Sequence, residues 1–267
     1  MSSTYRQYQE ARDTAWRALL RLKEKRMPVE PEALAALLGV EIHPDPDPGE
    51  NQRLWALTRQ VRGVCVSLRI KGAWHLFVRD SSLDDSRRRF AVAHELGHLL
   101  LGHGTRSLAP GVRCFESGDN QGDLIEDPQE MTDYAADIFA IRLLSPACLL
   151  HELGVDTPGG IMALCGLPPR AAALRAERMA LLNRRNVFYV NPLERQVRDA
   201  FRPWLLSRMT PAAPKRAIPL LLPERKSTEQ PEKEQLPVFR QPWRRRAVYA
   251  LLLLAALALL FLLGKRA

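Results

Sequence analysis

The segment "RRRFAVAHELGHLLLGHG", residues 87–104, has two histidines and a glutamate at the spacing of a metal site. His94, Glu95 and His98 spell H-E-x-x-H, and positions i and i+4 share one face of a helix. Both imidazoles can therefore reach one ion, and zinc accepts neutral imidazole nitrogen. Glu95 is placed to take a proton from a water at the open coordination position. The spacing predicts a zinc site with two histidine ligands and Glu95 as general base.

Apolar residues surround this polar trio, which indicates that the helix is largely buried. They are Phe90, Val92, Ala93, Leu96, Leu99 and Leu100. Burying two histidines and a carboxylate without a partner is unfavourable. A bound metal ion therefore explains the pattern better than a helix with two structural histidines and a solvated glutamate.

A catalytic zinc ion needs a third protein ligand, and His103 is the nearest candidate. It follows His94 by nine positions, which does not match the metzincin spacing, because Leu101 and Gly104 stand where a glycine and a third histidine are needed. On a continued helix His103 would face roughly 140° away from His98. We interpret His103 as a helix-end histidine and not as a ligand.

An acidic stripe farther along the chain is the better source of the third ligand. The segment 128–144 has helical spacing, and three acids fall at positions i, i+3 and i+7: Glu130, Asp133 and Asp137. The neighbouring residues are small or apolar, so this helix is expected to pack closely on something. One carboxylate of the stripe can bind the metal while another orients a histidine.

The elements that position these residues predict an α+β fold, with a small sheet and helices around it. Predicted helices cover 9–26, a short segment ending at Gly39, 82–101, 128–144, 158–183 and 193–208. Predicted strands follow Gly39 and cover 64–70 and 73–78, the last two as a hairpin through Lys71-Gly72. The part of the second hairpin strand at 74–78, just before the motif helix, is a candidate edge for pairing with a substrate peptide.

Three local signals complete this outline. Ser82 and Asp85 have capping-box spacing at the start of the motif helix. Asp127 and Pro128 predict the N-cap and first position of the acidic helix. Residues 105–126 are rich in Gly, Asp and Ser and are predicted to be a loop.

The chain divides into a globular domain (1–200), a Pro-rich basic linker (201–243) and a C-terminal anchor (244–267). The anchor contains "AVYALLLLAALALLFLLG", residues 247–264, whose 18 uncharged residues would span about 27 Å as a helix, close to the thickness of the bilayer hydrocarbon. More basic residues precede this stretch than follow it, and the N-terminus has no apolar signal segment. These features predict a tail-anchored protein of the bacterial cell membrane with its domain in the cytoplasm.

The net charge of +9 belongs to the C-terminal part of the chain. Residues 1–201 contain 26 Lys/Arg and 26 Asp/Glu, whereas residues 202–267 contain 13 and 4. The excess suits an anionic membrane surface, and no direct nucleic-acid binding is expected of the neutral domain. The four cysteines have no CxxC spacing, which predicts free thiols in a reducing compartment.

The motif pair resembles that of the ImmA/IrrE family of zinc metallopeptidases, peptidase family M78. "RFAVAHELGHLLLGH" and "DYAADIFAIRLLSP" are similar to the family's F-x-x-A-H-E-L-G-H and E-x-x-A-[ND]-x-F-A-x-x-L-L-x-P. The similarity extends over roughly residues 10–185. It implies a zincin-like fold, His94 and His98 as zinc ligands, and Glu95 as general base.

The chain departs from the family pattern at the third ligand. Asp133 stands where the family has glutamate, and Asp137 aligns with the Asn/Asp position. Because aspartate is one methylene shorter, the two helices must approach more closely or the ion must shift. We prefer Asp133 as the ligand, with Asp137 orienting a histidine and Glu130 as the alternative ligand.

Two functions follow from these patterns. The first is a membrane-tethered, zinc-dependent endopeptidase that cleaves a cytoplasmic protein, and the resemblance implies a transcriptional repressor, often of the helix-turn-helix type. The second is a non-catalytic, zinc-containing sensor or scaffold that binds a regulator at the membrane. The aspartate at position 133 and the tether motivate the second function.

Overall fold

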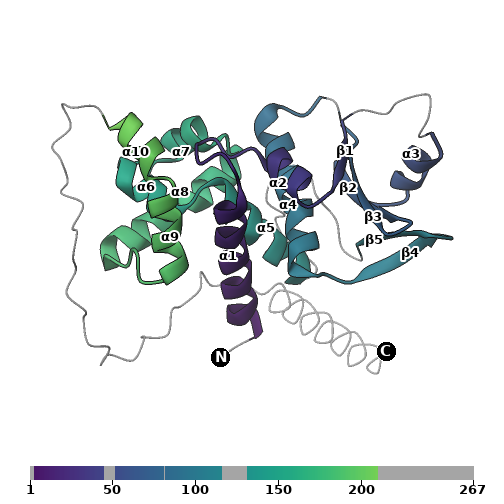
Figure 1. Cartoon of the computed structure of the whole chain (residues 1–267), viewed down its shortest axis with the longest axis horizontal. Helices are drawn as coiled ribbons and strands as arrows, with labels where there is room; N and C mark the ends of the chain where they lie inside the picture. The colour runs from purple at the N-terminus through teal and green to yellow at the C-terminus, as the bar shows by residue number, and fades with distance from the viewer. Residues whose placement is uncertain (1–2, 45–51, 81, 116–130, 210–267) are drawn as a thin grey trace, which may run out of the picture. The chain divides into compact units, whose positions relative to one another are not determined.

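The computed structural model of the chain describes residues 3–44, 52–80, 82–115 and 131–209 (Figure 1). The helices of this part are α1 (Ser3–Arg21), α2 (Pro31–Leu37), α3 (Gln52–Thr58), α4 (Asp85–Leu101), α5 (Met131–Leu144), α6 (Ala147–Leu153), α7 (Pro158–Cys165), α8 (Pro169–Arg185), α9 (Pro192–Ala200) and α10 (Arg202–Arg208). The strands are β1 (Glu41–His43), β2 (Cys65–Ile70), β3 (Ala73–Val78), β4 (Thr105–Ala109) and β5 (Val112–Phe115). This mixture of helices and one sheet confirms the predicted α+β class.

The five described strands form one sheet in the order β1-β3-β2-β5-β4. β1 runs parallel to β3, and the other neighbours are antiparallel. The predicted hairpin is confirmed: β2 and β3 meet through Lys71 and Gly72, whose φ angles of 49° and 94° fit a tight hairpin turn. In Figure 1 the sheet and α3 lie on one side, α6 to α10 on the other, and α1, α4 and α5 between them.

The expectation that residues 74–78 form a sheet edge is wrong. They belong to β3, which pairs with β1 on one side and with β2 on the other. The short strand β1, which follows Gly39, occupies this edge instead. Parallel strands are joined by a crossover connection, so β1 can pair with β3 although other elements lie between them in the chain. The terminal strands of the described sheet are therefore β1 and β4.

The predicted loop at 105–126 is also partly wrong, because its first half forms the β4–β5 hairpin. Gly111, with φ of 76°, turns the chain between the two strands. Val112 and Cys114 are buried and alternate with exposed Arg113, as expected for a strand with one face in the core. The Gly- and Asp-rich composition that suggested a loop comes mainly from residues 116–126, which lie outside the described residues.

The helix that carries the motif starts two positions later than the capping box predicted. Asp84, and not Ser82, is its N-cap: the Asp84 carboxylate accepts hydrogen bonds from the amides of Ser86 and Arg87, each at 3.0 Å. Ser82 instead donates its amide and hydroxyl hydrogens to Asp80 in a preceding turn. The predicted stop at Gly102 is confirmed, with φ of 68°.

Three other helix predictions needed their bounds corrected. The first helix ends at Arg21 and not at residue 26, because the Lys25 ammonium folds back and donates to the terminal carbonyls of Leu19 and Leu20, each at 2.8 Å. The predicted helix at 158–183 is divided into α7 and α8 by left-handed Gly166 and the two prolines that follow it. The predicted helix at 193–208 is likewise divided into α9 and α10, at Phe201.

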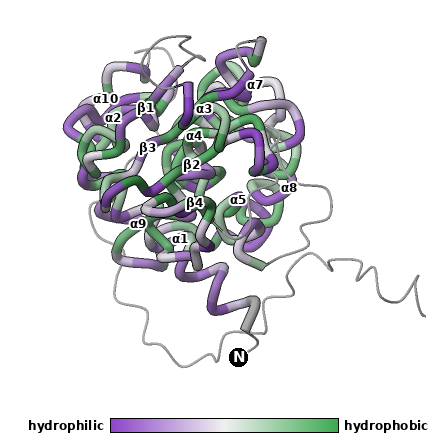
Figure 2. The backbone as a smooth tube through the Cα atoms, turned by 90° about the vertical axis from the view of Figure 1, so that its right-hand side faces the viewer, coloured by the Kyte–Doolittle hydropathy of each residue, from purple (hydrophilic) through white to green (hydrophobic). Residues whose placement is uncertain are grey.

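The core has two layers, one on each face of the sheet. On one face α3 covers a cluster formed by Trp55, Val66, Leu68, Phe77, Val112 and Cys114. On the other face α4 packs against β2 and β3, and its far side contacts α5, which in turn packs on α1. Figure 2 shows the hydrophobic segments gathered around β2 and α4 and the hydrophilic ones toward the outside. The cysteines at 65, 114, 148 and 165 are free and buried.

One described stretch, Met131–Leu153, has the length and composition of a membrane span. It is 89% buried inside the protein and is interrupted at Ser145 and Pro146, so it is weak evidence for a span and is better explained as core. The predicted span at 247–264, Glu130 and the N-cap expected at Asp127 lie outside the described residues.

Candidate metal centre

The three residues of the H-E-x-x-H motif lie in the buried middle of α4. His94 and His98 are each 0% exposed and Glu95 is 3% exposed. The Asp84 cap and left-handed Gly102 fix the two ends of the helix, and Leu96 anchors its middle in the core. The sequence thus places a polar trio on a rigid element, inside the protein, where unpaired polar groups are unfavourable.

The two histidines turn the same ring atom toward each other. His94 Nε2 and His98 Nε2 are 2.9 Å apart, and the ring centroids are 4.8 Å apart. This is the outcome expected of positions i and i+4 on one helical face. Two imidazole nitrogens so close can reach a single ion, because zinc–nitrogen bonds are about 2.0–2.1 Å long.

The acidic helix supplies carboxylates to both histidines. Asp133 Oδ1 lies 3.3 Å from His98 Nε2, on the side where the two Nε2 atoms meet. Asp137 Oδ1 lies 2.7 Å from His94 Nδ1, on the opposite side of that ring. Both aspartates are buried, at 4% and 3% exposure. The structure therefore separates the stripe into one carboxylate among the candidate ligand atoms and one behind a histidine.

Gly97 allows α4 and α5 to approach closely enough for these contacts. A Cβ atom at this position would lie 3.0 Å from Phe139 Cδ1 and 3.2 Å from both the Cα and the carbonyl oxygen of Ala136. The glycine of HELGH thus faces Ala136, the second alanine of DYAAD. The aspartate side chain is short, and the close packing of the two helices compensates for this by bringing the Asp133 oxygen to His98.

His103 lies against the metal centre, contrary to the prediction that it faces elsewhere. Its Nδ1 is 2.9 Å from His98 Nδ1, and the two rings meet edge to face with centroids 4.7 Å apart. The prediction assumed a continued helix, but the backbone turns at Gly102 and folds the imidazole back onto His98. His103 is not among the candidate ligands. Its ring lies behind the candidate ligand His98, on the Nδ1 side of that ring.

Burial and neighbouring charges shift the pKa values of two of these rings. Burial, together with the neighbouring imidazoles of His98 and His94, lowers the pKa of His103 to about 4, so the ring is neutral at pH 7. A neutral His103 can accept a hydrogen bond from the His98 tautomer that carries its hydrogen on Nδ1. Burial also opposes a charge on His94, but its hydrogen bond to Asp137 and the nearby carboxylates outweigh burial and raise its pKa.

The residues present fit a zinc ion. His94 Nε2, His98 Nε2 and a carboxylate oxygen of Asp133 lie within 4.8 Å of one another and are all buried. Two imidazoles and one carboxylate are the protein ligands of many catalytic zinc sites, which keep a fourth position for water. Both Nδ1 atoms have partners, which leaves both Nε2 atoms for the metal.

Two aromatic residues form the sheet side of the site and were missed by sequence reasoning. The Phe115 ring lies 5.0 Å from the His98 ring and stacks on Trp74 at 4.7 Å. They come from β5 and β3, whose pairing with β2 brings them near α4. The only sequence signal for Phe115 was its alternation with Cys114, which was hidden by the loop-like composition around it.

Taken with the fold, this arrangement is that of a metallopeptidase domain built on an H-E-x-x-H helix. The sequence profile of Peptidase_M78, described as an IrrE N-terminal-like domain, matches residues 38–176, which is 139 of the 267 residues. The chain belongs to this family, as the motif pair indicated. The match covers α4 and α5 and all of the described strands. No curated protein matches the chain significantly.

Proposed function

We propose that the chain is a zinc-dependent endopeptidase that hydrolyses a peptide bond of a protein substrate. One observation carries the proposal: the Nε2 atoms of His94 and His98 and a carboxylate oxygen of Asp133 converge in a buried site, beside buried Glu95. Membership of a metallopeptidase family supports the same reaction class. Hydrolysis needs both a group that activates water and a group that stabilises charge on the carbonyl oxygen.

The roles of the residues follow from their positions. Zinc, when bound, supplies a Lewis acid that polarises the scissile carbonyl and makes water nucleophilic at neutral pH. His94, His98 and Asp133 would hold the ion. Glu95 accepts a proton as water attacks the carbonyl carbon, and then donates it to the departing amine. Buried surroundings favour this transfer, because charge interactions are stronger where water is excluded.

A free edge of the sheet would bind an extended substrate through backbone hydrogen bonds. Since β3 is an interior strand, we assign this role to β4, a terminal strand of the described sheet. Thr105 of β4 pairs with Phe115, whose ring contacts His98. A substrate segment hydrogen-bonded to β4 would pass close to the candidate ligands.

The location and the partner of the enzyme are proposed from the sequence alone. The apolar stretch 247–264 would anchor the chain in the cell membrane with the domain in the cytoplasm. The substrate would be a cytoplasmic transcriptional regulator, with a helix-turn-helix repressor as the first candidate. The balanced charge of residues 1–201 supports recognition of a protein and not of nucleic acid.

Glu95→Gln tests the mechanism. The variant keeps the shape of the side chain but loses the base, so zinc content should stay unchanged while hydrolysis falls on the order of 10²- to 10⁴-fold. Comparative proteomics of wild-type and Glu95→Gln cells would identify the stabilised substrate, and purified full-length protein would then be assayed on it with zinc. Exposed Glu177 on α8 gives the control, Glu177→Gln, with wild-type activity expected. Undiminished cleavage by Glu95→Gln would refute the proposed chemistry.

The second candidate, a non-catalytic zinc sensor or scaffold, is favoured by the short carboxylate at position 133. A scaffold needs the metal and the fold but not the base. Its signature would be a normal phenotype in Glu95→Gln cells together with a loss of function in cells that lack the gene. The same pair of strains therefore separates the two functions.

A further inference from the structure

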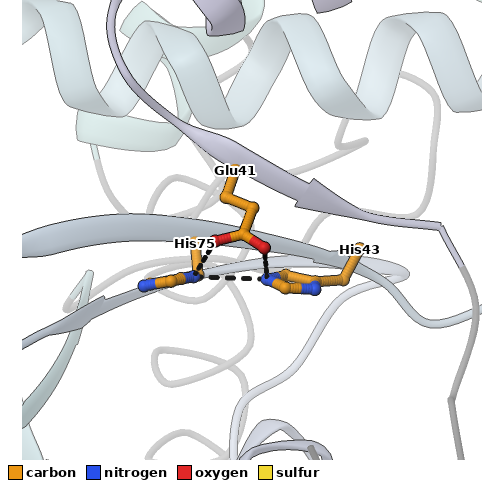
Figure 3. A group of neighbouring side chains, drawn as sticks. All are labelled: Glu41, His43 and His75. Carbon is orange, nitrogen blue, oxygen red and sulfur yellow. Dashed lines mark hydrogen bonds and ion pairs between the residues drawn. The ribbon is translucent and has the colours of Figure 1, made fainter.

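A second cluster of metal-binding side chains lies at the edge of the sheet. Glu41 and His43 alternate along β1, so their side chains are on the same face of the strand. Glu41 pairs in register with His75 of β3, which brings the second imidazole to the same face. Figure 3 shows the three side chains directed toward one another from the two strands. We call Glu41, His43 and His75 the sheet-edge cluster.

The distances in the cluster suit a shared ion. His43 Nε2 and His75 Nδ1 are 3.2 Å apart, and Glu41 Oε2 is 3.3 Å from His75 Nδ1. Glu41 Oε1 is 3.8 Å from His43 Nε2. One ligand atom from each residue therefore lies within 4.8 Å of the other two. Two imidazole nitrogens and a carboxylate oxygen match the preferences of zinc and of similar divalent transition metals.

Packing holds the two rings in place while the carboxylate remains in water. The His43 ring stacks on Phe77 with centroids 4.5 Å apart and on His75 at 5.5 Å. The side chains of His43 and His75 are 14% and 19% exposed, whereas that of Glu41 is 65% exposed. The histidines are thus pre-oriented by core residues, and an ion held by the cluster would keep positions open to solvent.

The sheet-edge cluster is separate from the metal centre of α4. His43 stacks on Phe77, which belongs to the core cluster beneath α3 together with Cys114. Phe115, the next residue after Cys114, contacts His98. Because successive residues of a strand point to opposite faces, the two groups of histidines lie on opposite faces of the sheet. The two groups have no residue in common.

We propose that Glu41, His43 and His75 form a second, solvent-accessible site for a divalent transition-metal ion, with zinc as the expected ligand. The site goes beyond the proposed peptidase reaction, since it contains no residue of the H-E-x-x-H motif. An ion bound here joins the terminal strand β1 to its neighbour β3 through side chains as well as backbone. Since β1 has only three residues, this bond strengthens the edge of the sheet.

The test measures zinc stoichiometry by equilibrium dialysis and elemental analysis and zinc affinity by calorimetry. Full-length protein in detergent is stripped with a chelator and then titrated with zinc. Wild-type protein should bind two ions per chain. The double variant His43→Gln/His75→Gln should bind one ion, at the metal centre of α4. The double variant His94→Gln/His98→Gln should also bind one ion, at the sheet-edge cluster. His151→Gln is the matched control, because this imidazole stacks on Phe188 outside both clusters, and it should bind two.

A single exposed substitution guards against a folding artefact in the double variant. Glu41→Gln removes one ligand from a largely solvent-exposed position and should leave the circular dichroism spectrum of the metal-free protein unchanged. It should weaken binding of the second ion by about tenfold or more, as expected when a group of the metal environment is lost. The proposal is overturned if the Glu41→Gln and His43→Gln/His75→Gln proteins still bind two ions with wild-type affinities, which would mean a hydrogen-bonded cluster only.

Discussion

Each histidine of the H-E-x-x-H motif has a partner at its Nδ1 atom, and this partner influences how well the ring can bind a metal at Nε2. With a metal at both Nε2 atoms, Nδ1 of His94 would donate to Asp137 and Nδ1 of His98 would donate to neutral His103. Both Nε2 atoms are directed at the same point, 2.9 Å apart, which leaves them available to a metal ion. A carboxylate behind one ring and an imidazole behind the other give the two ligands different basicities.

His103 is expected to tune the metal centre without touching the ion. His103→Phe keeps an aromatic ring beside His98 but removes the hydrogen-bond acceptor, so zinc affinity should fall about 10- to 100-fold. Competition with a chromophoric chelator measures this change. His151→Phe, at a histidine far along the chain that stacks on Phe188, should leave the affinity unaltered. Equal affinities for wild type and His103→Phe would show that the contact is only packing.

The identity of the third ligand is a second question at this scale. Asp133→Ala should lose the ion held between α4 and α5, because among the described residues Asp133 supplies the only carboxylate oxygen placed with the Nε2 atoms of His94 and His98. Glu130→Ala should keep that ion. Elemental analysis of the two purified variants decides between them. Loss of zinc in Glu130→Ala together with retention in Asp133→Ala would transfer the ligand role to Glu130.

At the scale of elements, the close packing of α4 on α5 determines the geometry of the site. His94 and His98 lie on one helix and their aspartate partners on the other, so every contact depends on the separation of the two axes. Gly97 and Ala136 set that separation, because their backbones meet where a side chain would intervene. The shorter reach of aspartate makes the site more sensitive to this spacing than a glutamate ligand would be.

Gly97→Ala should therefore weaken the site while leaving its ligands intact. The added methyl group increases helix propensity by about 1 kcal/mol but overpacks the interface by typically 1–3 kcal/mol. The net expectation is a lower free energy of unfolding in chelator and a lower zinc affinity. Urea denaturation and zinc competition measure these two quantities.

Gly159→Ala provides the matched control. Gly159 lies in α7, and a Cβ atom there would meet nothing within 4 Å. The same substitution should leave zinc affinity unchanged and should not lower stability, since it gains helix propensity without a clash. If Gly97→Ala behaves like this control, helix spacing does not govern the metal centre.

The elements with strong local signals were predictable from the sequence. The motif helix α4 and the acidic helix α5 follow from apolar spacing, and the β2–β3 hairpin follows from a Lys-Gly turn between β-rich segments. His94, His98 and Asp133 could be singled out because their residue types and spacing carry the chemistry. Their geometry depends on the close helix contact that Gly97 permits. The sequence indicated only that an aspartate ligand requires the two helices to approach more closely or the ion to shift.

What could not be predicted depends on contacts between distant segments. The position of β3 inside the sheet requires β1, which reaches it from more than 30 residues away. The contact of His103 with His98 depends on the backbone turn at Gly102, which a helical projection cannot represent. The sheet-edge cluster escaped notice for the same reason, since Glu41 and His75 become neighbours only through strand register.

On the scale of the whole described domain, the metal centre lies where its two parts meet. The sheet with α2, α3 and α4 forms one part, and α1 with α5 to α10 forms the other (Figure 1). α4 and α5 make the main contact between them, and the candidate ligands come from both helices. An ion held by these ligands is a crosslink between the parts. It also neutralises a buried carboxylate that would otherwise be unfavourable there.

Removal of the metal should therefore destabilise the domain as a whole. With free zinc at about 1,000 times its dissociation constant, binding stabilises the folded state by about 4 kcal/mol. For a domain of this size each kilocalorie shifts the melting temperature by about 2–4 °C, so chelation should lower it by roughly 8–16 °C. Differential scanning calorimetry of full-length protein in detergent, with and without chelator, measures the shift.

The double variant His98→Gln/Asp133→Asn separates this effect from zinc bound at the sheet edge. It lacks one ligand from each helix, so the crosslink between the two parts cannot form, while Glu41, His43 and His75 are unchanged. Its melting temperature should respond to the chelator only by the smaller amount that the sheet-edge cluster contributes, because that cluster joins two strands of the same part. If wild type and this variant lose the same number of degrees, the stabilising ion is not held between α4 and α5.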